Sequence, residues 1–225
     1  MHLSVIIPAL NEESRIVATV TAAAAVHPFE IIVVDGGSRD RTATVAARPG
    51  VHVVSSARGR ARQMNAGAHT ATGDVLLFLH ADARLPTSAA RDVATALENP
   101  RVVGGRFDVR LDGSAPIYRV IETLMNARSR LTRIATGDQA IFVRRRVFDD
   151  LGGYASIPLM EDIEFSSRLK RAGRIACLHS RVLASSRRWQ QRGPGRTIAL
   201  MWALRALYAA GVSPQRLARA YASVR

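Results

Sequence analysis

The 225-residue sequence is short of cysteine, lysine and aromatic residues, and each shortage narrows the interpretation. Cys177 is the single cysteine, so no intramolecular disulfide can form, and we expect a reducing, cytoplasmic location. Lys170 is the single lysine, so arginine carries nearly all of the formal net charge of +14, which in part reflects genomic composition. Aromatic residues make up 5 %, which leaves few rings to stack on nucleic-acid bases. A basic nucleic-acid-binding protein without catalysis stays an alternative, but the positive charge would be its only support. We therefore expect no nucleic-acid partner.

Long apolar runs are also missing, because Arg, Pro or Gly interrupts each of them. No segment reaches the roughly 20 apolar residues of a membrane span. We expect no secretory signal, since Met1 is followed by neither a basic start nor a long apolar region. No G-x-G-x-x-G opens a helix after a strand, which argues against a dinucleotide-binding oxidoreductase. A nucleotidyltransferase stays an alternative, although a glycine-rich start with Arg and Lys is missing after the first strand.

The first third of the chain alternates short apolar runs with helical segments. Strands are predicted at 3–7, 31–34, 51–54 and 75–79, with helices between them at about 14–26, 36–47 and 61–71. This alternation predicts an α/β fold with a doubly wound, mostly parallel sheet and helices on both faces.

The pattern loosens after residue 82. We expect a helix to about 97, a strand at 102–111, a helix at 117–131, a strand at 140–143 and a helix at 163–172. A pair of strands at 175–178 and 182–184 follows, and then helices at 197–210 and after 214. We therefore expect one domain over 1–190, in two parts at 1–84 and 85–190, and a C-terminal helical extension at 191–225.

Several polar residues stand where strands are predicted to end. The buried run 75–79 leads into His80 and Asp82, and ligands of parallel sheets bind outside the carboxyl ends of strands. Asp35 ends another predicted strand, and Glu161 and Asp162 stand at a predicted helix start. Taken singly, each acid is equally well explained as a turn or helix-start residue. Together, one acid could hold a divalent cation on a diphosphate while another removes a proton from an incoming hydroxyl.

Four segments in this order resemble the signature of inverting family-2 glycosyltransferases with the GT-A fold: 4–13, 33–42, 80–82 and 160–162. The resemblance extends to about Trp189. It implies a GT-A fold and an inverting transfer of a sugar from a nucleoside diphosphate sugar, a UDP-sugar or GDP-sugar, to an acceptor hydroxyl. It also implies a divalent cation, Mg²⁺ or Mn²⁺. Residues 1–84 would bind the nucleotide and 85–190 the acceptor. A relative that binds a sugar nucleotide without catalysis stays open.

The resemblance assigns roles to individual residues. Asp162 matches the general base, with Glu161 beside it, and Asp82 matches the last acid of the metal-binding element. His80 stands where the family more commonly has an acid; as a ligand it would favour Mn²⁺, and the alternative is that it hydrogen-bonds nearby backbone. The residues that match those around the nucleotide-sugar are Pro8, Ala9, Glu12, Asp35, Arg60, Asn65, Ala81, Asp82, Arg188 and Trp189.

Two further segments have open roles. Gly137, Asp138 and Gln139 could line the acceptor side, or form a polar turn that opens a strand. The apolar run 198–204, with Trp202, could rest on anionic lipid at the inner face of the plasma membrane and reach a lipid-linked acceptor. It could equally pack on the core or join two copies as a homodimer. Nearby charge comes from arginines at 192, 196, 205, 216, 219 and 225.

Overall fold

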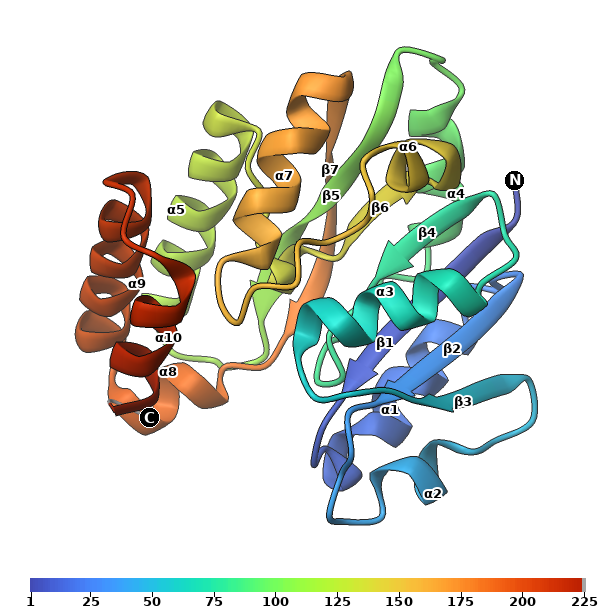
Figure 1. Ribbon diagram of the computed structural model, residues 1–225, viewed down its shortest axis with the longest axis horizontal. Helices are drawn as coiled ribbons and strands as arrows, with labels where there is room; N and C mark the ends of the chain where they lie inside the picture. Colours follow the sequence, from blue (N-terminus) through green and yellow to red (C-terminus); the bar gives the residue numbers. More distant parts are fainter. Residues whose placement is uncertain (224–225) are drawn as a thin grey trace.

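A seven-stranded sheet runs through the molecule, with helices on both of its faces, in a computed structural model that describes residues 1–223 (Figure 1). Residues 224 and 225, the second of which is Arg225, lie outside the described part. The strands are β1 (Leu3–Ala9), β2 (Glu30–Asp35), β3 (Val51–Ser55), β4 (Val75–Phe78), β5 (Val102–Leu111), β6 (Ile141–Arg144) and β7 (Arg174–Ala184).

The helices follow the expected alternation in the first third and are more numerous after it. They are α1 (Glu13–Ala24), α2 (Thr42–Ala46), α3 (Arg60–Thr70), α4 (Ala89–Leu97), α5 (Pro116–Thr132), α6 (Arg145–Asp150), α7 (Glu161–Ala172), α8 (Arg187–Arg192), α9 (Pro194–Ala209) and α10 (Pro214–Ser223), with a 3-10 turn η1 (Gly137–Gln139) before β6. The expected domain boundary at residue 190 falls inside α8.

The strand order is β3-β2-β1-β4-β6-β5-β7. The pairs β1–β2, β1–β4, β2–β3 and β5–β7 are parallel, whereas β6 is antiparallel to both β4 and β5. The expected α/β fold with a mostly parallel sheet is confirmed. The direction of β6 matters for the site, because it brings the residues before β6 beside the residues that follow β4.

The two faces of the sheet bury alternate residues of the same strands, as the period of two requires. In β1, Val5 and Ile7 pack with α1 and α4 on one face, whereas Ile6 packs with α3 and α7 on the other. Helix α3 lies close to the sheet: a Cβ added to Gly67 would stand 2.4 Å from Cγ2 of Ile6. This close packing holds the start of α3 over the carboxyl ends of β1 and β2.

Two expectations for the secondary structure are wrong. The strand pair expected at 175–178 and 182–184 is the single strand β7. The polar residues between the two runs lie at a shift in the pairing of β7 with β5. Arg106 of β5 pairs with Cys177, but Asp108 pairs with Arg181. These residues therefore interrupt the register of the pair and do not end the strand. The helix expected at 36–47 covers only Thr42–Ala46, because residues 36–41 form a hydrogen-bonded loop.

The C-terminal helices pack on the domain. Leu204 of α9 and Leu217 of α10 are buried with Met160, and Ile198 packs against the cluster that contains Tyr118 of α5. One side of α9 stays exposed, with Trp202 at 63 %. Among residues 1–223, none of the helices has the length and apolar character needed to cross a membrane.

Candidate functional site

A cleft of about 760 Å³ opens at the carboxyl ends of β1 and β4. Pro8 and Ala9 end β1, and His80, Ala81 and Asp82 follow β4. The sheet continues in opposite directions from this strand pair, and ligands of open α/β sheets bind at such a switch point. The start of α3, the turn η1 and helix α8 supply the remaining walls.

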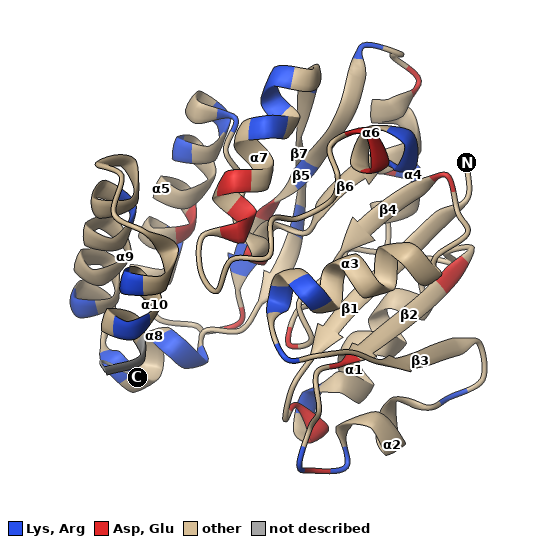
Figure 2. Cartoon of the chain, in the orientation of Figure 1, with Lys and Arg blue, Asp and Glu red and all other residues tan. Residues whose placement is uncertain are grey.

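The walls of the cleft carry more basic than acidic side chains. Acidic residues gather at the start of α7 and basic residues on the neighbouring α8, α9 and α10 (Figure 2). Three acids line the cleft: Glu12, Asp82 and Asp138. The arginines that line it are Arg58, Arg60, Arg187, Arg188 and Arg192. Guanidinium groups match the geometry of phosphate oxygens, so this charge suits a diphosphate.

Arg60 is held by the start of α7. Its Nη1 donates to Oε1 of Glu161 at 3.1 Å, and the Glu161 side chain is 4 % exposed. Burial acts to lower the pKa of the Arg60 guanidinium, but the charges of Glu161 and Asp162 prevail and raise that pKa above its ordinary value. Glu161 thus orients a permanently charged Arg60 toward the cleft.

His80 contacts Asp138 across the two antiparallel strands β4 and β6. Nδ1 of His80 lies 3.1 Å from Oδ1 of Asp138. Nε2 of His80 is buried without a hydrogen-bond partner, and a Cβ added to Gly137 would stand 2.2 Å from it. Both ring nitrogens are therefore occupied or covered. This geometry favours the interpretation of His80 as a hydrogen-bonding residue, with a carboxylate as partner instead of backbone.

Asp138 is a strongly acidic group in this setting. Burial acts to raise the pKa of its carboxyl, but the hydrogen bond and charge of His80, with the charges of Arg188 and Arg60, hold that pKa far below the ordinary value. A carboxylate of such low pKa stays ionised and takes up a proton poorly. Asp138 is thus suited to binding and orienting groups in the cleft.

Asp82 offers its carboxylate to the cleft. Its nearest ion-pair partner among the described residues is Arg187, whose Nη2 lies 3.9 Å from Oδ2 of Asp82 and 3.1 Å from Oε1 of Glu12. Within residues 1–223, His, Cys, Asp and Glu do not gather in a group of three that could hold a metal ion. One carboxylate fits Mg²⁺ or Mn²⁺ when substrate phosphates and waters supply the other oxygens.

Asp162 lies beneath the cleft and does not line it. Its Oδ2 accepts from the backbone N–H of Gly137 at 2.9 Å, and its Oδ1 accepts from the N–H of Ile163 at 2.7 Å. It lines a small inner cavity together with Arg60 and His80, which also line the cleft. Asp162 forms no ion pair within 4.0 Å in the described part of the chain.

The structure brings most of the sequence-predicted residues to the cleft or its floor; the three exceptions are Asp35, Asn65 and Gln139. The carboxylate of Asp35 accepts from the N–H groups of Gly37 and Ser38 at 3.1 and 3.0 Å. Those that line the cleft are Pro8, Ala9, Glu12, Arg60, His80, Ala81, Asp82, Asp138, Arg188 and Trp189.

The other two exceptions also bind backbone. The amide of Asn65 donates to the carbonyl of Tyr154 at 2.8 Å and accepts from its N–H at 2.9 Å. Gln139 is fully buried, and its Oε1 accepts from the N–H of Thr136 at 3.2 Å. In this structure all three polar side chains order the loops around the cleft.

Sequence reasoning missed several lining residues. Arg187 belongs with Arg188 and Trp189 to the basic segment of the resemblance but was not assigned to the site. Arg58 and Arg192 lie in arginine-rich segments, so charge clustering could have found them. Gln63 lines the cleft and donates to the carbonyls of Ala9 and Val34 at 2.7 and 2.9 Å. No sequence signal points to the lining residues Pro158 and Tyr221.

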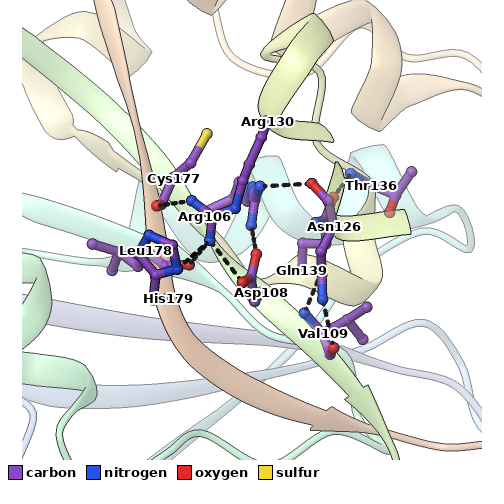
Figure 3. A network of polar contacts seen from close by, with 10 residues as sticks. All are labelled: Arg106, Asp108, Val109, Asn126, Arg130, Thr136, Gln139, Cys177, Leu178 and His179. Carbon is purple, nitrogen blue, oxygen red and sulfur yellow. Dashed lines mark hydrogen bonds and ion pairs between the residues drawn. The ribbon is translucent and has the colours of Figure 1, made fainter. Parts of the chain in front are cut away.

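A second polar network fastens α5 to β5 and β7 (Figure 3). Arg106, 1 % exposed, pairs with Asp108, and Nη2 of Arg130 lies 2.7 Å from Oδ2 of Asp108. Arg130 also donates to the carbonyl of Cys177 at 3.0 Å. Asn126 accepts from the N–H of Val109 at 2.9 Å and donates to its carbonyl at 3.0 Å. Strands β5 and β7 also contact the turn η1, so the network lies next to that turn.

Comparison with known sequences gives one family and several relatives. The family described as Glycosyl transferase family 2 matches residues 4–155. The Bacillus subtilis protein "Probable glycosyltransferase YdaM" is 28 % identical over 235 residues, which cover 93 % of this chain and 54 % of the relative. "Uncharacterized glycosyltransferase Rv0539" of Mycobacterium tuberculosis is 40 % identical over 81 residues, 36 % of each chain. The chain thus spans about half the length of the Bacillus relative.

Solved structures share the fold. S. aureus TarS 1-349 superposes with a TM-score of 0.68 at 19 % identity, covering 83 % of this chain and 61 % of that one, and similar matches are complexes of TarS with UDP and with UDP-GlcNAc. The mannosyltransferase PcManGT from Pyrobaculum calidifontis, in complex with GDP-Man and Mn²⁺, superposes with a TM-score of 0.65 at 21 % identity, covering 81 % and 56 %. The mixed sheet of this chain is therefore the GT-A fold of glycosyltransferases.

Proposed function

Because the chain belongs to glycosyl transferase family 2, we propose that it transfers a sugar from a nucleoside diphosphate sugar to an acceptor hydroxyl, with inversion at the anomeric carbon. The observation that carries this proposal is the cleft at the ends of β1 and β4, which combines arginines with the Asp82 carboxylate. Residues 1–84 would bind the nucleotide and 85–190 the acceptor. The UDP, UDP-GlcNAc and GDP-Man complexes of the structural neighbours support a UDP-sugar or GDP-sugar donor.

The donor diphosphate would lie between Asp82 and the arginines of the cleft. When bound, a divalent cation held by Asp82 would neutralise charge that develops on the leaving diphosphate. Arg60, fixed by Glu161, and Arg188 would contribute further positive charge at preset positions, which lowers the cost of reorganisation during the reaction. The Mn²⁺ complex of PcManGT supports a cation, and Mg²⁺ stays the other candidate.

Asp162 is the proposed general base. Asp138, which lines the cleft, and Asp162, which lines the inner cavity, differ in electrostatic setting. Asp138 has a strongly lowered pKa beside His80, whereas Asp162 has backbone N–H partners and no ion pair in the described part. The backbone bonds fix the Asp162 carboxylate and leave each oxygen a lone pair for a proton. A hydroxyl that loses its proton to Asp162 can attack the anomeric carbon opposite the leaving diphosphate, and one such displacement inverts the configuration.

The test of donor binding is a thermal-shift panel. UDP, GDP, UDP-GlcNAc and GDP-mannose are each added with Mg²⁺, with Mn²⁺ or with chelator, because a ligand of the folded state raises the melting temperature. We expect one nucleotide series to stabilise the chain, and more so with a cation. No stabilisation by any of these compounds would refute the proposal.

The test of Asp162 is the slow hydrolysis of the stabilising sugar nucleotide, with water as acceptor. We expect Asp162→Asn to reduce this hydrolysis by on the order of 100-fold or more. Stabilisation by the nucleoside diphosphate should stay unchanged. A variant that hydrolyses the donor at the wild-type rate would remove Asp162 from the role of base.

We also propose that α5 and α9 contact an anionic lipid surface at the inner face of the plasma membrane. Apolar side chains are exposed on both helices, with Leu124 at 60 % on α5 and Trp202 at 63 % on α9. The net charge of +14 complements anionic lipid. We expect flotation with vesicles that contain phosphatidylglycerol, and less flotation for Trp202→Ser with Leu124→Ser. Equal flotation, or a dimer that this double variant dissociates, would contradict the membrane contact.

A further inference from the structure

Two arginines stand beside the proposed base without an acidic partner. Arg128 lies on α5 and Arg205 on α9, and neither lines the cleft that would hold the donor. In the described part of the chain neither forms an ion pair within 4.0 Å. Nη2 of Arg128 is buried and lacks a hydrogen-bond partner. Buried donors without partners are rare in proteins and call for an explanation, such as a ligand.

The two guanidinium groups lie close enough to affect each other. Burial, together with the positive charges of Arg205 and Arg106, lowers the pKa of Arg128 to about 10, although the charge of Asp162 acts in the opposite direction. Burial also lowers the pKa of Arg205, again opposed by Asp162. Their shared negative neighbour is thus the carboxylate proposed as the general base.

Neighbouring arginines have carboxylate partners, whereas Arg128 has none within 4.0 Å in the described part of the chain. Arg130 binds Asp108 and the carbonyl of Cys177, and Arg119 lies 2.7 Å from Glu122. Arg106 is paired with Asp108. Arg128 and Arg205 are therefore two positive charges without an ion-pair partner within 4.0 Å in the described part, and both are influenced by the charge of Asp162. The donor arginines are on α3, α8 and the loop before α3, so the two sets are separate.

We propose that Arg128 and Arg205 bind a phosphate group of the acceptor, close to the hydroxyl that Asp162 activates. This inference rests on the proposed function and deepens it, because it names the acceptor as a phosphate-bearing molecule. A phosphate carries up to about two negative charges, which two guanidinium groups neutralise with charge-assisted hydrogen bonds. The phosphate can belong to a soluble ester or to a lipid headgroup.

The experiment measures binding of two phosphate probes in the presence of Mn²⁺ and of the nucleoside diphosphate, UDP or GDP, that stabilises the chain. Glycerol 3-phosphate is the soluble probe, with glycerol as its neutral match, and vesicles with phosphatidic acid are the lipid probe, with phosphatidylcholine vesicles for comparison. We expect Arg128→Gln and Arg205→Gln each to weaken binding of the phosphate probe about tenfold. Arg171→Gln removes the same charge from the exposed far end of α7 and should bind as wild type.

The results distinguish a soluble phosphate ester from a lipid phosphate and from the absence of a phosphate site. Loss of glycerol 3-phosphate binding in both variants supports a soluble phosphate ester, and the same loss seen only with vesicles supports a lipid phosphate. Absence of binding to both probes, or equal binding by all variants, overturns the inference. The rise in melting temperature with the stabilising nucleoside diphosphate, UDP or GDP, reports the folding of each variant. If neither UDP nor GDP stabilises the wild type, the proposed function fails, whereas binding of the phosphate probes can still be measured on the chain without a nucleotide.

Discussion

Nδ1 of His80 lies 3.1 Å from Oδ1 of Asp138, so the residue after β4 is joined to the turn before β6. The contact pairs two side chains that are 58 positions apart in the sequence. It occupies Nδ1 of the imidazole, while Gly137 covers the other ring nitrogen, Nε2. Three predictions concern this contact and its surroundings, a fourth concerns the network behind it, and a fifth concerns the ion pair between Glu12 and Arg187.

The first prediction concerns pH. The pKa of Asp138 is lowered in the folded chain, so this carboxylate stabilises the fold above the ordinary Asp pKa of about 3.9, and the stabilisation is lost as pH falls through the lowered folded pKa. We expect the free energy of unfolding of wild type to exceed that of Asp138→Asn at pH 6 and the gap to shrink below pH of about 4. Urea titrations over this range measure it. A gap that widens with acid would contradict the assignment.

The second prediction separates His80 from Asp82 as the cation ligand. With Mn²⁺ present, we expect Asp82→Asn to weaken UDP binding by about tenfold or more, because a carboxylate ligand is lost. His80→Ala should leave the Mn²⁺-dependent part of UDP binding intact, since both ring nitrogens face other groups. Calorimetric titration of UDP with Mn²⁺ and with chelator measures both. If His80→Ala abolished the Mn²⁺ effect, His80 would be a ligand after all.

The third prediction concerns the glycine that covers His80. In Gly137→Ala the new Cβ would collide with Nε2 of His80, so the turn or the ring must move. We expect a loss of about 1 to 3 kcal/mol in the free energy of unfolding, together with slower hydrolysis of the donor. Gly195→Ala is the matched control, because nothing lies within 4 Å of its added Cβ. Equal unfolding free energies for both variants would show that His80 can move freely.

The fourth prediction concerns Asp108, which pairs with Arg106 and Arg130 behind the turn. Asp108→Ala leaves the buried Arg106 without its carboxylate, and we expect a loss of about 3 to 5 kcal/mol in the free energy of unfolding. Combining Asp108→Leu with Arg106→Met removes both charges and should recover much of that loss. Urea unfolding measures both variants. If the double variant were less stable than Asp108→Ala, the loss of stability could not be attributed to the unpaired charge of Arg106.

The sequence pattern was sufficient to predict the positions of most strands and of the site residues that lie at their ends. Pro8, Ala9 and Asp82 could be placed at one edge because parallel strands end at one edge. The contact between His80 and Asp138 could not be predicted, because it depends on β6 running antiparallel to β4. The sequence of a short apolar strand does not indicate the direction in which the strand runs.

The side chains of Asp35 and Asn65 show a second limit. Both sit near the expected place, yet their polar atoms bind backbone of the surrounding loops. Residue type and spacing define where a side chain starts, and the local hydrogen-bond donors decide what it contacts. Arg128 and Arg205 were similarly hidden, because their proximity arises from the packing of α9 beside α5.

The ion pair between Arg187 and Glu12 affects how fast a nucleoside diphosphate binds and leaves the cleft. In this structure its guanidinium pairs with Glu12 and lies near Asp82, so a phosphate that recruits Arg187 must displace carboxylates from it. Binding is then an exchange of one anionic partner for another, and the net gain in free energy is smaller than for an unpaired arginine. The same exchange runs backwards when the nucleoside diphosphate departs, because Glu12 is ready to take the guanidinium back. We therefore expect Glu12→Gln to tighten UDP binding and to slow its dissociation, which stopped-flow displacement of UDP would measure.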